Sequence, residues 1–122
     1  MSGTIKLTTG LTHTNGNQSV SVPSKTKEIS QAGQIVFIDT PTIATSATTI
    51  TTGSISTLGV GFIENLDPAN FVKVGLDVGG TPAYFQKIKA GERYPMRFVP
   101  GITIKAIADT AAVKVQVTIY ED

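Results

Sequence analysis

The chain has 122 residues, a formal net charge of +1 and no cysteine, which excludes disulfides and thiolate metal sites. This length fits a single domain, residues 1–122, that can bury its own core. Only 16% of the residues are charged, neither half of the chain has a run of one sign, and threonine and serine together number 26. The charge pattern therefore argues against duplex nucleic acid or an anionic membrane surface as a partner.

Apolar and polar residues alternate along much of the chain, the period-two pattern of half-buried strands, and helical periodicity is nearly absent. The pattern predicts strands near residues 4–8, 18–22, 34–38, 42–50, 55–63, 70–78, 81–89, 92–99, 102–108 and 113–120. Residues 9–33 are polar and rich in turn formers, so we expect a long loop or an extended arm there.

Residues 40–61 carry no charged side chain. This stretch contains too much Thr, Ser and Gly for a bilayer-spanning helix, so no membrane span is expected. Two readings of it stay open: an edge strand without charges that pairs with another chain, and a strand pair inside the sheet. Gly59 and Gly61 fall within a predicted strand, where they indicate a bulge or a close backbone approach.

The C-terminal half predicts three hairpins. Gly79-Gly80 suits a two-residue loop, since both positions accept positive φ. This hairpin and a second one closed by Ala90-Gly91 both assign Ala83 and Phe85 to one apolar face, although Ile88 then faces outward. A third hairpin, with the loop 109–112, pairs the strands 102–108 and 113–120 so that one face is apolar. Such one-sided sheets must cover one another, which predicts an all-β antiparallel β-sandwich, with a jelly roll as one form of it.

One motif, Asp77-Val78-Gly79-Gly80-Thr81, looks like the phosphate-binding Asp-x-Gly-Gly-Thr of sugar kinases with the actin-like ATPase fold. Those enzymes need two large lobes, and only 41 residues follow Thr81. The hairpin already explains both glycines. We therefore expect no nucleotide binding.

Residues that could carry catalysis are few. His13 is the only histidine and stands in a polar segment, and no serine lies in a Gly-x-Ser-x-Gly elbow. Asp67-Pro68-Ala69-Asn70 fits a turn better than a calcium ligand set. The remaining carboxylates are scattered, so we expect no enzyme, no catalytic residue, no cofactor and no metal; those near predicted turns are Glu64, Asp77, Glu92 and Asp109.

Four basic residues, Lys87, Lys89, Arg93 and Arg97, are interleaved with aromatic residues, a pattern that can serve single-stranded nucleic acid. In the predicted register the two lysines lie on one face and the two arginines on the other. That division argues against a nucleic-acid platform.

Several segments taken together resemble small structural proteins encoded by tailed bacteriophages and prophages. They are Phe62–Asp67, Phe71–Gly75, Ile88–Glu92 and Ile104–Val113, followed by Glu121-Asp122 at the C-terminus. The resemblance covers about residues 60–122, and its motifs are turns and strands, so it transfers no functional residue. It implies a β-sandwich virion protein located on the capsid surface, with capsid decoration (cement) as its role.

The partners implied by this resemblance are the major capsid protein and further copies of the chain. Two other classes of function stay open beside decoration of the head. One is a structural component of the neck or tail, and the other is a carbohydrate-binding β-sandwich. The second would need exposed aromatic residues, but the chain has no Trp and its three Tyr residues do not cluster in sequence. A small hydrolase is a weaker third possibility.

Overall fold

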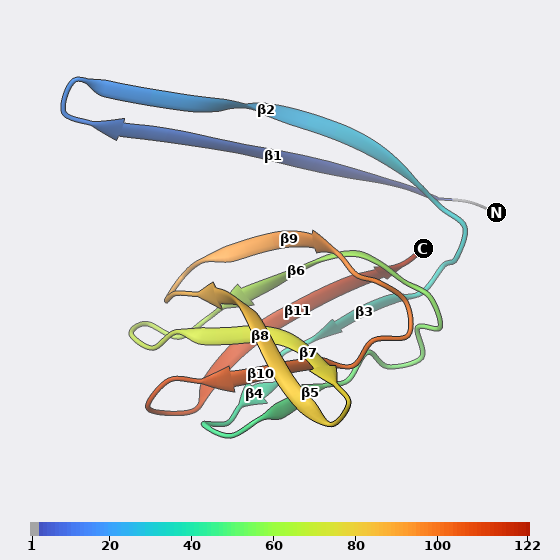
Figure 1. Cartoon of the computed structure of the whole chain (residues 1–122). Helices are drawn as coiled ribbons and strands as arrows, with labels where there is room; N and C mark the ends of the chain where they lie inside the picture. The colour runs from blue at the N-terminus through green and yellow to red at the C-terminus, as the bar shows by residue number, and fades with distance from the viewer. Residues whose placement is uncertain (1–2) are drawn as a thin grey trace. The chain divides into compact units, whose positions relative to one another are not determined.

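The computed structural model describes residues 3–122 and contains eleven strands and no helix among them. The single domain predicted over the whole chain is divided into two compact units, one ending at Gln34 and the other beginning at Ile35. The first is a two-stranded ribbon and the second a β-sandwich (Figure 1). The strands are β1 (Gly3–Asn15), β2 (Gln18–Gln31), β3 (Val36–Asp39), β4 (Thr42–Ile43), β5 (Thr48–Ile50), β6 (Leu58–Asn65), β7 (Val72–Val78), β8 (Thr81–Ile88), β9 (Arg93–Arg97), β10 (Ile104–Ala108) and β11 (Val113–Glu121).

The sandwich consists of two antiparallel sheets, which confirms the predicted fold class. One sheet has the order β5-β10-β7-β8, and the other has the order β3-β11-β6-β9 with β4 also paired to β11. β3 and β4 act as one strand broken at Pro41, whose carbonyl oxygen accepts a hydrogen bond from the Val115 N–H at 3.1 Å. If β3 and β4 are counted as one strand, the two sheets contain eight strands, and their order is that of a jelly roll.

The core lies between the sheets and is almost entirely aliphatic. Inward-facing residues alternate along β10 and β11, as the period-two pattern predicted. These two strands contribute seven of the core side chains. The contiguous core cluster consists of Ile43, Ile50, Ile55, Leu58, Ile63, Val72, Val74, Ile88, Phe98, Ile104, Ala106, Ala108, Val113, Val115, Val117 and Ile119.

Two of the three predicted hairpins are wrong. β10 pairs with β5 and β7, whereas β11 pairs with β3, β4 and β6, so the turn at 109–112 carries the chain from one sheet to the other. The turn at Ala90-Gly91 does the same, because β8 pairs with β7 and β9 pairs with β6. The apolar faces meet across the sandwich instead of side by side in one sheet. Alternation alone does not distinguish these two arrangements.

The β7–β8 hairpin is confirmed near its loop. Gly79 and Gly80 have φ values of 59° and 89°, and Leu76 lies opposite Ala83 as predicted. Beyond Gly75 the register shifts by one residue, which leaves Phe85 as the extra residue of a β-bulge. Phe85, predicted in the core, is therefore 73% exposed, and Ile88, predicted outside, is fully buried opposite Val72.

Glycine is required where strands approach closely at this bulge and in β6. A Cβ atom on Gly75 would overlap the carbonyl oxygen of Ala83, and one on Gly61 would overlap the carbonyl oxygen of Thr118. The β6–β11 register also shifts, between Ile119 and Glu121. The prediction of a bulge or close approach at the β6 glycines is therefore confirmed.

Asn65, at the end of β6, joins both sheets and two crossover turns. It is 1% exposed, and its Nδ2 donates to the carbonyl oxygens of Asn70 at 2.8 Å and Ile88 at 3.0 Å. Its Oδ1 accepts from the Asp67 N–H at 2.8 Å, and its main chain bonds with Gly91 and Glu92. Every polar group of this buried residue is thus satisfied, as a buried amide requires.

The ribbon replaces the loop or arm predicted over residues 9–33. β1 and β2 pair along their whole length around a turn at Gly16, and a bulge sets Pro23 and Ser24 opposite Gly10. Proline is tolerated there because a bulge leaves it out of the hydrogen-bonded ladder. The sequence predicted two shorter strands here, near residues 4–8 and 18–22, because beyond them the alternation runs between threonine or serine and scattered aliphatic residues.

We expect Asn65→Ala to lower the free energy of unfolding by about 3 kcal/mol, since it leaves buried donors and acceptors without partners. Asn70→Ala is the control, because the Asn70 side chain accepts only an exposed bond from Thr110; it should cost less than about 1 kcal/mol. Urea unfolding monitored by circular dichroism measures both. Equal losses would contradict the role assigned to Asn65.

Gly75→Ala should lower the free energy of unfolding by about 3 kcal/mol or more, because the added methyl group overlaps backbone on the neighbouring strand. Gly79→Ala, four residues away in the same hairpin, meets open space and incurs only the strain of positive φ, about 1–2 kcal/mol. The same unfolding measurement separates them. A larger loss at Gly79 would contradict the bulge geometry.

Candidate functional site

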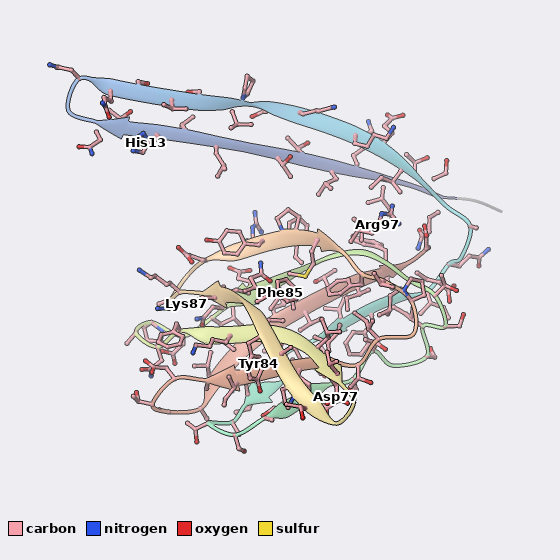
Figure 2. The ribbon with its side chains drawn as sticks, in the orientation of Figure 1. His13, Asp77, Tyr84, Phe85, Lys87 and Arg97 are labelled. Carbon is pink, nitrogen blue, oxygen red and sulfur yellow. The ribbon has the colours of Figure 1, made fainter. Side chains whose placement is uncertain are left out.

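The Asp77–Thr81 motif lies at the tip of the β7–β8 hairpin (Figure 2). Both glycines form the turn, and the Asp77 N–H donates to the carbonyl oxygen of Thr103 at 3.1 Å. The turn thus accounts for Gly79 and Gly80 without a phosphate. The kinase-like pattern gains no structural support as a nucleotide site.

The four basic residues named in the sequence do not form one surface strip, because β8 and β9 belong to different sheets. Arg97 pairs with Asp122 at 3.3 Å. Lys87 lies directly opposite Lys73, and their Nζ atoms are 4.2 Å and 5.9 Å from the centroid of the Phe71 ring. The aromatic ring offsets the repulsion of two like charges on adjacent strands.

Asp67 belongs to a turn, as the sequence predicted. Its Oδ2 accepts hydrogen bonds from the N–H groups of Asn70 at 2.6 Å and Ala69 at 2.9 Å, and these bonds hold the pKa of Asp67 below its usual value. At the neighbouring turn, the Lys89 N–H and the Tyr94 hydroxyl both bond to Glu92 and lower the pKa of that carboxyl. The same bond raises the pKa of Tyr94. Both carboxylates are therefore engaged in holding turns.

The described part of the chain, residues 3–122, brings no three histidine or carboxylate side chains together as a metal site would require. His13 lies on the ribbon opposite Val20, away in sequence from every candidate carboxylate. Glu64, Asp77 and Asp109 lie on β6, on β7 and after β10.

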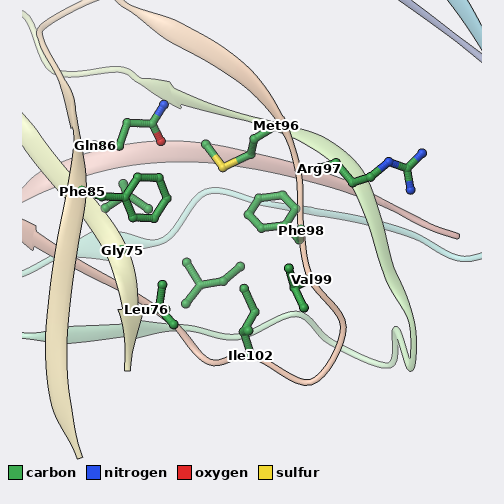
Figure 3. Close-up of a pocket in the computed structure, with 11 residues that line it drawn as sticks. Gly75, Leu76, Phe85, Gln86, Met96, Arg97, Phe98, Val99 and Ile102 are labelled. Atoms are coloured by element: carbon green, nitrogen blue, oxygen red, sulfur yellow. The ribbon is translucent and has the colours of Figure 1, made fainter. Parts of the chain in front are cut away.

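A cavity of about 330 Å³ lies between the two sheets, where β8 and β9 form adjacent but unpaired edges (Figure 3). Phe85, Met96 and Phe98 converge on it, whereas the guanidinium of Arg97 points away. The Oε1 atom of Gln86 is buried at its wall without a hydrogen-bond partner in the described residues. The cavity suits an apolar group that carries a hydrogen-bond donor. The remaining lining residues are Val74, Gly75, Leu76, Val99, Ile102 and Ile104.

The ribbon provides a second candidate surface, because one of its two faces collects its aliphatic side chains. Residues opposite each other share a face, and pairs two positions apart lie on the same side. The bulge at Gly10 shifts the register by one residue, so that Val22 lies opposite Leu11 and Val20 opposite His13. We call this side the apolar ribbon face; its aliphatic members are Ile5, Leu7, Leu11, Val20, Val22 and Ile29, and Lys25, Lys27 and His13 lie on the same side.

The other side of the ribbon is polar and makes its own contacts. Thr8 and Thr26 share a hydrogen bond of 2.8 Å, and Lys6 lies 3.8 Å from Glu28. The apolar ribbon face is by contrast exposed toward the tip, where Leu11 is 71% and Val22 57% exposed. Leu11 and Val22 form an exposed aliphatic pair, which makes this face a candidate binding surface.

A comparison of the chain with protein-family models, curated proteins and solved structures finds no match. Residues 3–122 include no helix of the length and apolarity needed to cross a membrane. The cavity and the apolar ribbon face are therefore the candidate sites that the geometry offers.

Protonation of Asp67 should weaken the fold. Its folded pKa is lowered, so its contribution to stability is complete above the ordinary carboxyl value of about 4 and is lost as the pH falls through the lowered pKa. Asp67→Asn keeps an acceptor oxygen but removes the titration. Urea unfolding between pH 6 and about pH 3 should show a shallower pH dependence for this variant. The same substitution at Asp109 is the control, and an unchanged slope in Asp67→Asn would contradict the assignment.

Proposed function

We propose that this chain is a non-enzymatic structural protein that attaches to a larger assembly through its β1–β2 ribbon. The observation that carries this proposal is the apolar ribbon face, whose most exposed members, Leu11, Val20 and Val22, lie toward the tip. An isolated two-stranded hairpin is only marginally stable in water. A ribbon of this kind gains its stability by covering that face against another surface.

The edges of the sandwich favour the ribbon as the attachment element. Proline stands in both edge strands next to the cavity, Pro82 in β8 and Pro95 in β9. Pro41 interrupts the β3–β4 edge, and β5 has only three residues. Short and proline-containing edges disfavour pairing with another chain. Of residues 40–61, predicted either as a docking edge or as an interior pair, β6 is interior and β5 is an edge.

The assembly that we propose is the head of a tailed bacteriophage, with the protein as a decoration (cement) component. Two observations support it: the resemblance of residues 60–122 to small phage structural proteins, and the jelly-roll strand order, an architecture used in viral capsids and also in lectins. Uncharged Thr- and Ser-rich surfaces suit docking on a lattice, because their burial costs less desolvation than burial of charge. Repeated copies gain avidity from many weak contacts.

The number and place of copies in purified virions test this role. We expect copies in large excess over the tail proteins of the same particles, located on the head by immunogold labelling. Particles that lack the protein should lose DNA at lower temperature, with every enzymatic step intact. A single ring of copies at the neck or tail would reassign the protein to a connector. Its absence from particles would refute the virion role.

A further inference from the structure

The cavity between β8 and β9 has a buried apolar floor and an exposed apolar rim. Val74, Phe98 and Ile104 on its floor are buried, whereas Phe85 and Val99 at its rim are 73% and 66% exposed. Its volume of about 330 Å³ is roughly twice that of an apolar cavity that holds benzene. The space is therefore large enough for a bicyclic ring system.

One polar side-chain atom faces this space. Gln86 lies opposite the core residue Val74, so its side chain is on the inner side of β8. Its Oε1 atom is buried without a hydrogen-bond partner in the described part of the chain, and Figure 3 shows this oxygen turned toward the other lining residues. An unpaired buried acceptor is costly because it has lost its bonds with water. An N–H or O–H group bound in the cavity would remove that cost.

Water and charged molecules fit this space poorly. A buried water needs two to four polar partners, and Gln86 supplies the one unpaired buried side-chain atom among the described lining residues. Arg97 is the only charged residue in that set, and its guanidinium points away from the cavity and pairs with Asp122. A charged ligand would lose its hydration there without gaining an ion pair.

The edges beside the cavity favour a small molecule over a strand of another protein. Each of the two edge strands contains a proline, Pro82 in β8 and Pro95 in β9, and the bulge at Phe85 makes the β8 edge irregular. Prolines and bulges disfavour the addition of a further strand. An occupant without a main chain does not need a regular edge.

We propose that this cavity binds an uncharged aromatic molecule of one or two rings that carries one N–H or O–H donor. Gln86 Oε1 accepts the hydrogen bond, and the side chains of Met96 and Phe98 contact the rings, since thioether sulfur and aromatic rings both pack favourably on an aromatic ligand. The site does not depend on the proposed attachment role, because every lining residue belongs to the sandwich and none to the ribbon.

Indole and benzofuran provide a matched pair of probes, because they have nearly the same shape and only indole carries an N–H donor. Isothermal titration calorimetry of the full chain should show indole binding with a Kd below about 1 mM. Benzofuran should bind about 10-fold more weakly, the effect of losing one hydrogen bond to a buried acceptor. Since the chain has no Trp, the fluorescence of indole gives a second measurement of the same binding. Absence of indole binding, or equal affinities for the two probes, would overturn the proposal.

Gln86→Met tests the acceptor, because it removes the oxygen and keeps a side chain of similar length. The variant should lose the 10-fold preference for indole over benzofuran, with an unchanged circular dichroism spectrum. Gln116→Met is the matched control: Gln116 lies opposite Glu64, between the inward-facing Val115 and Val117 and thus on the outer side of β11. It should keep the full preference. A preference that survives in Gln86→Met would refute the role of Gln86.

The methyl group of Met96 reports where indole binds, and this measurement uses the wild-type chain. In a protein labelled at the methionine methyl groups, the Met96 signal is assigned by its absence from Met96→Leu. The ring current of a bound aromatic molecule should shift this signal as indole is added. Indole binding without a shift of the Met96 signal would place the site elsewhere and contradict the proposal.

N-acetyl-tryptophanamide distinguishes a free small molecule from a tryptophan side chain of a partner protein. It carries the same indole ring with two amide groups, which would lie against the apolar rim formed by Phe85 and Val99. Because those amides lose water there without gaining partners, binding should be about 10-fold weaker than that of indole. Binding as tight as that of indole would reassign the cavity to a partner's side chain and overturn the small-molecule site.

Discussion

The buried side chain of Asn65 fixes the place where the sandwich changes sheets. The chain crosses from β6 to β7 and from β8 to β9, and both crossings meet at this residue through bonds to Asn70, Ile88, Gly91 and Glu92. An unpaired amide in an aliphatic core would be costly, so the two turns must keep the positions that satisfy it. The separation of β8 from β9, and hence the cavity between them, depends on this corner.

The bulge at Phe85 determines which side chains line the cavity. A regular hairpin would keep Phe85 inside and Ile88 outside. The extra residue reverses both, so that Ile88 packs in the core and Phe85 stands at the cavity, largely exposed. Gly75 permits this arrangement because the opposite strand leaves no room for a Cβ atom. The absence of a side chain at Gly75 thus permits the bulge that shapes the apolar cavity.

A β-bulge also shapes the ribbon, where it produces an exposed aliphatic face. Its bulge at Gly10 brings aliphatic residues from both strands to one face, which is left exposed toward the tip. A sandwich with a closed core and blunted edges needs no such face for its own stability. The attachment that we propose is therefore assigned to the ribbon and not to the edges of the sandwich.

The sequence by itself determined the all-β class, most strand positions and the inward face of β10 and β11, because alternation at period two depends only on which side of a strand is buried. It also determined the Gly79-Gly80 turn, whose positive φ values are a local property. Only the tertiary structure decided which strands pair, because an apolar face can be covered from across the sandwich as well as by a neighbour. The cavity and the apolar ribbon face were hidden for a related reason. Each depends on a bulge, and a one-residue shift of register moves every following side chain to the other face. The poor fit of Ile88 in the regular register was the one local sign of that shift.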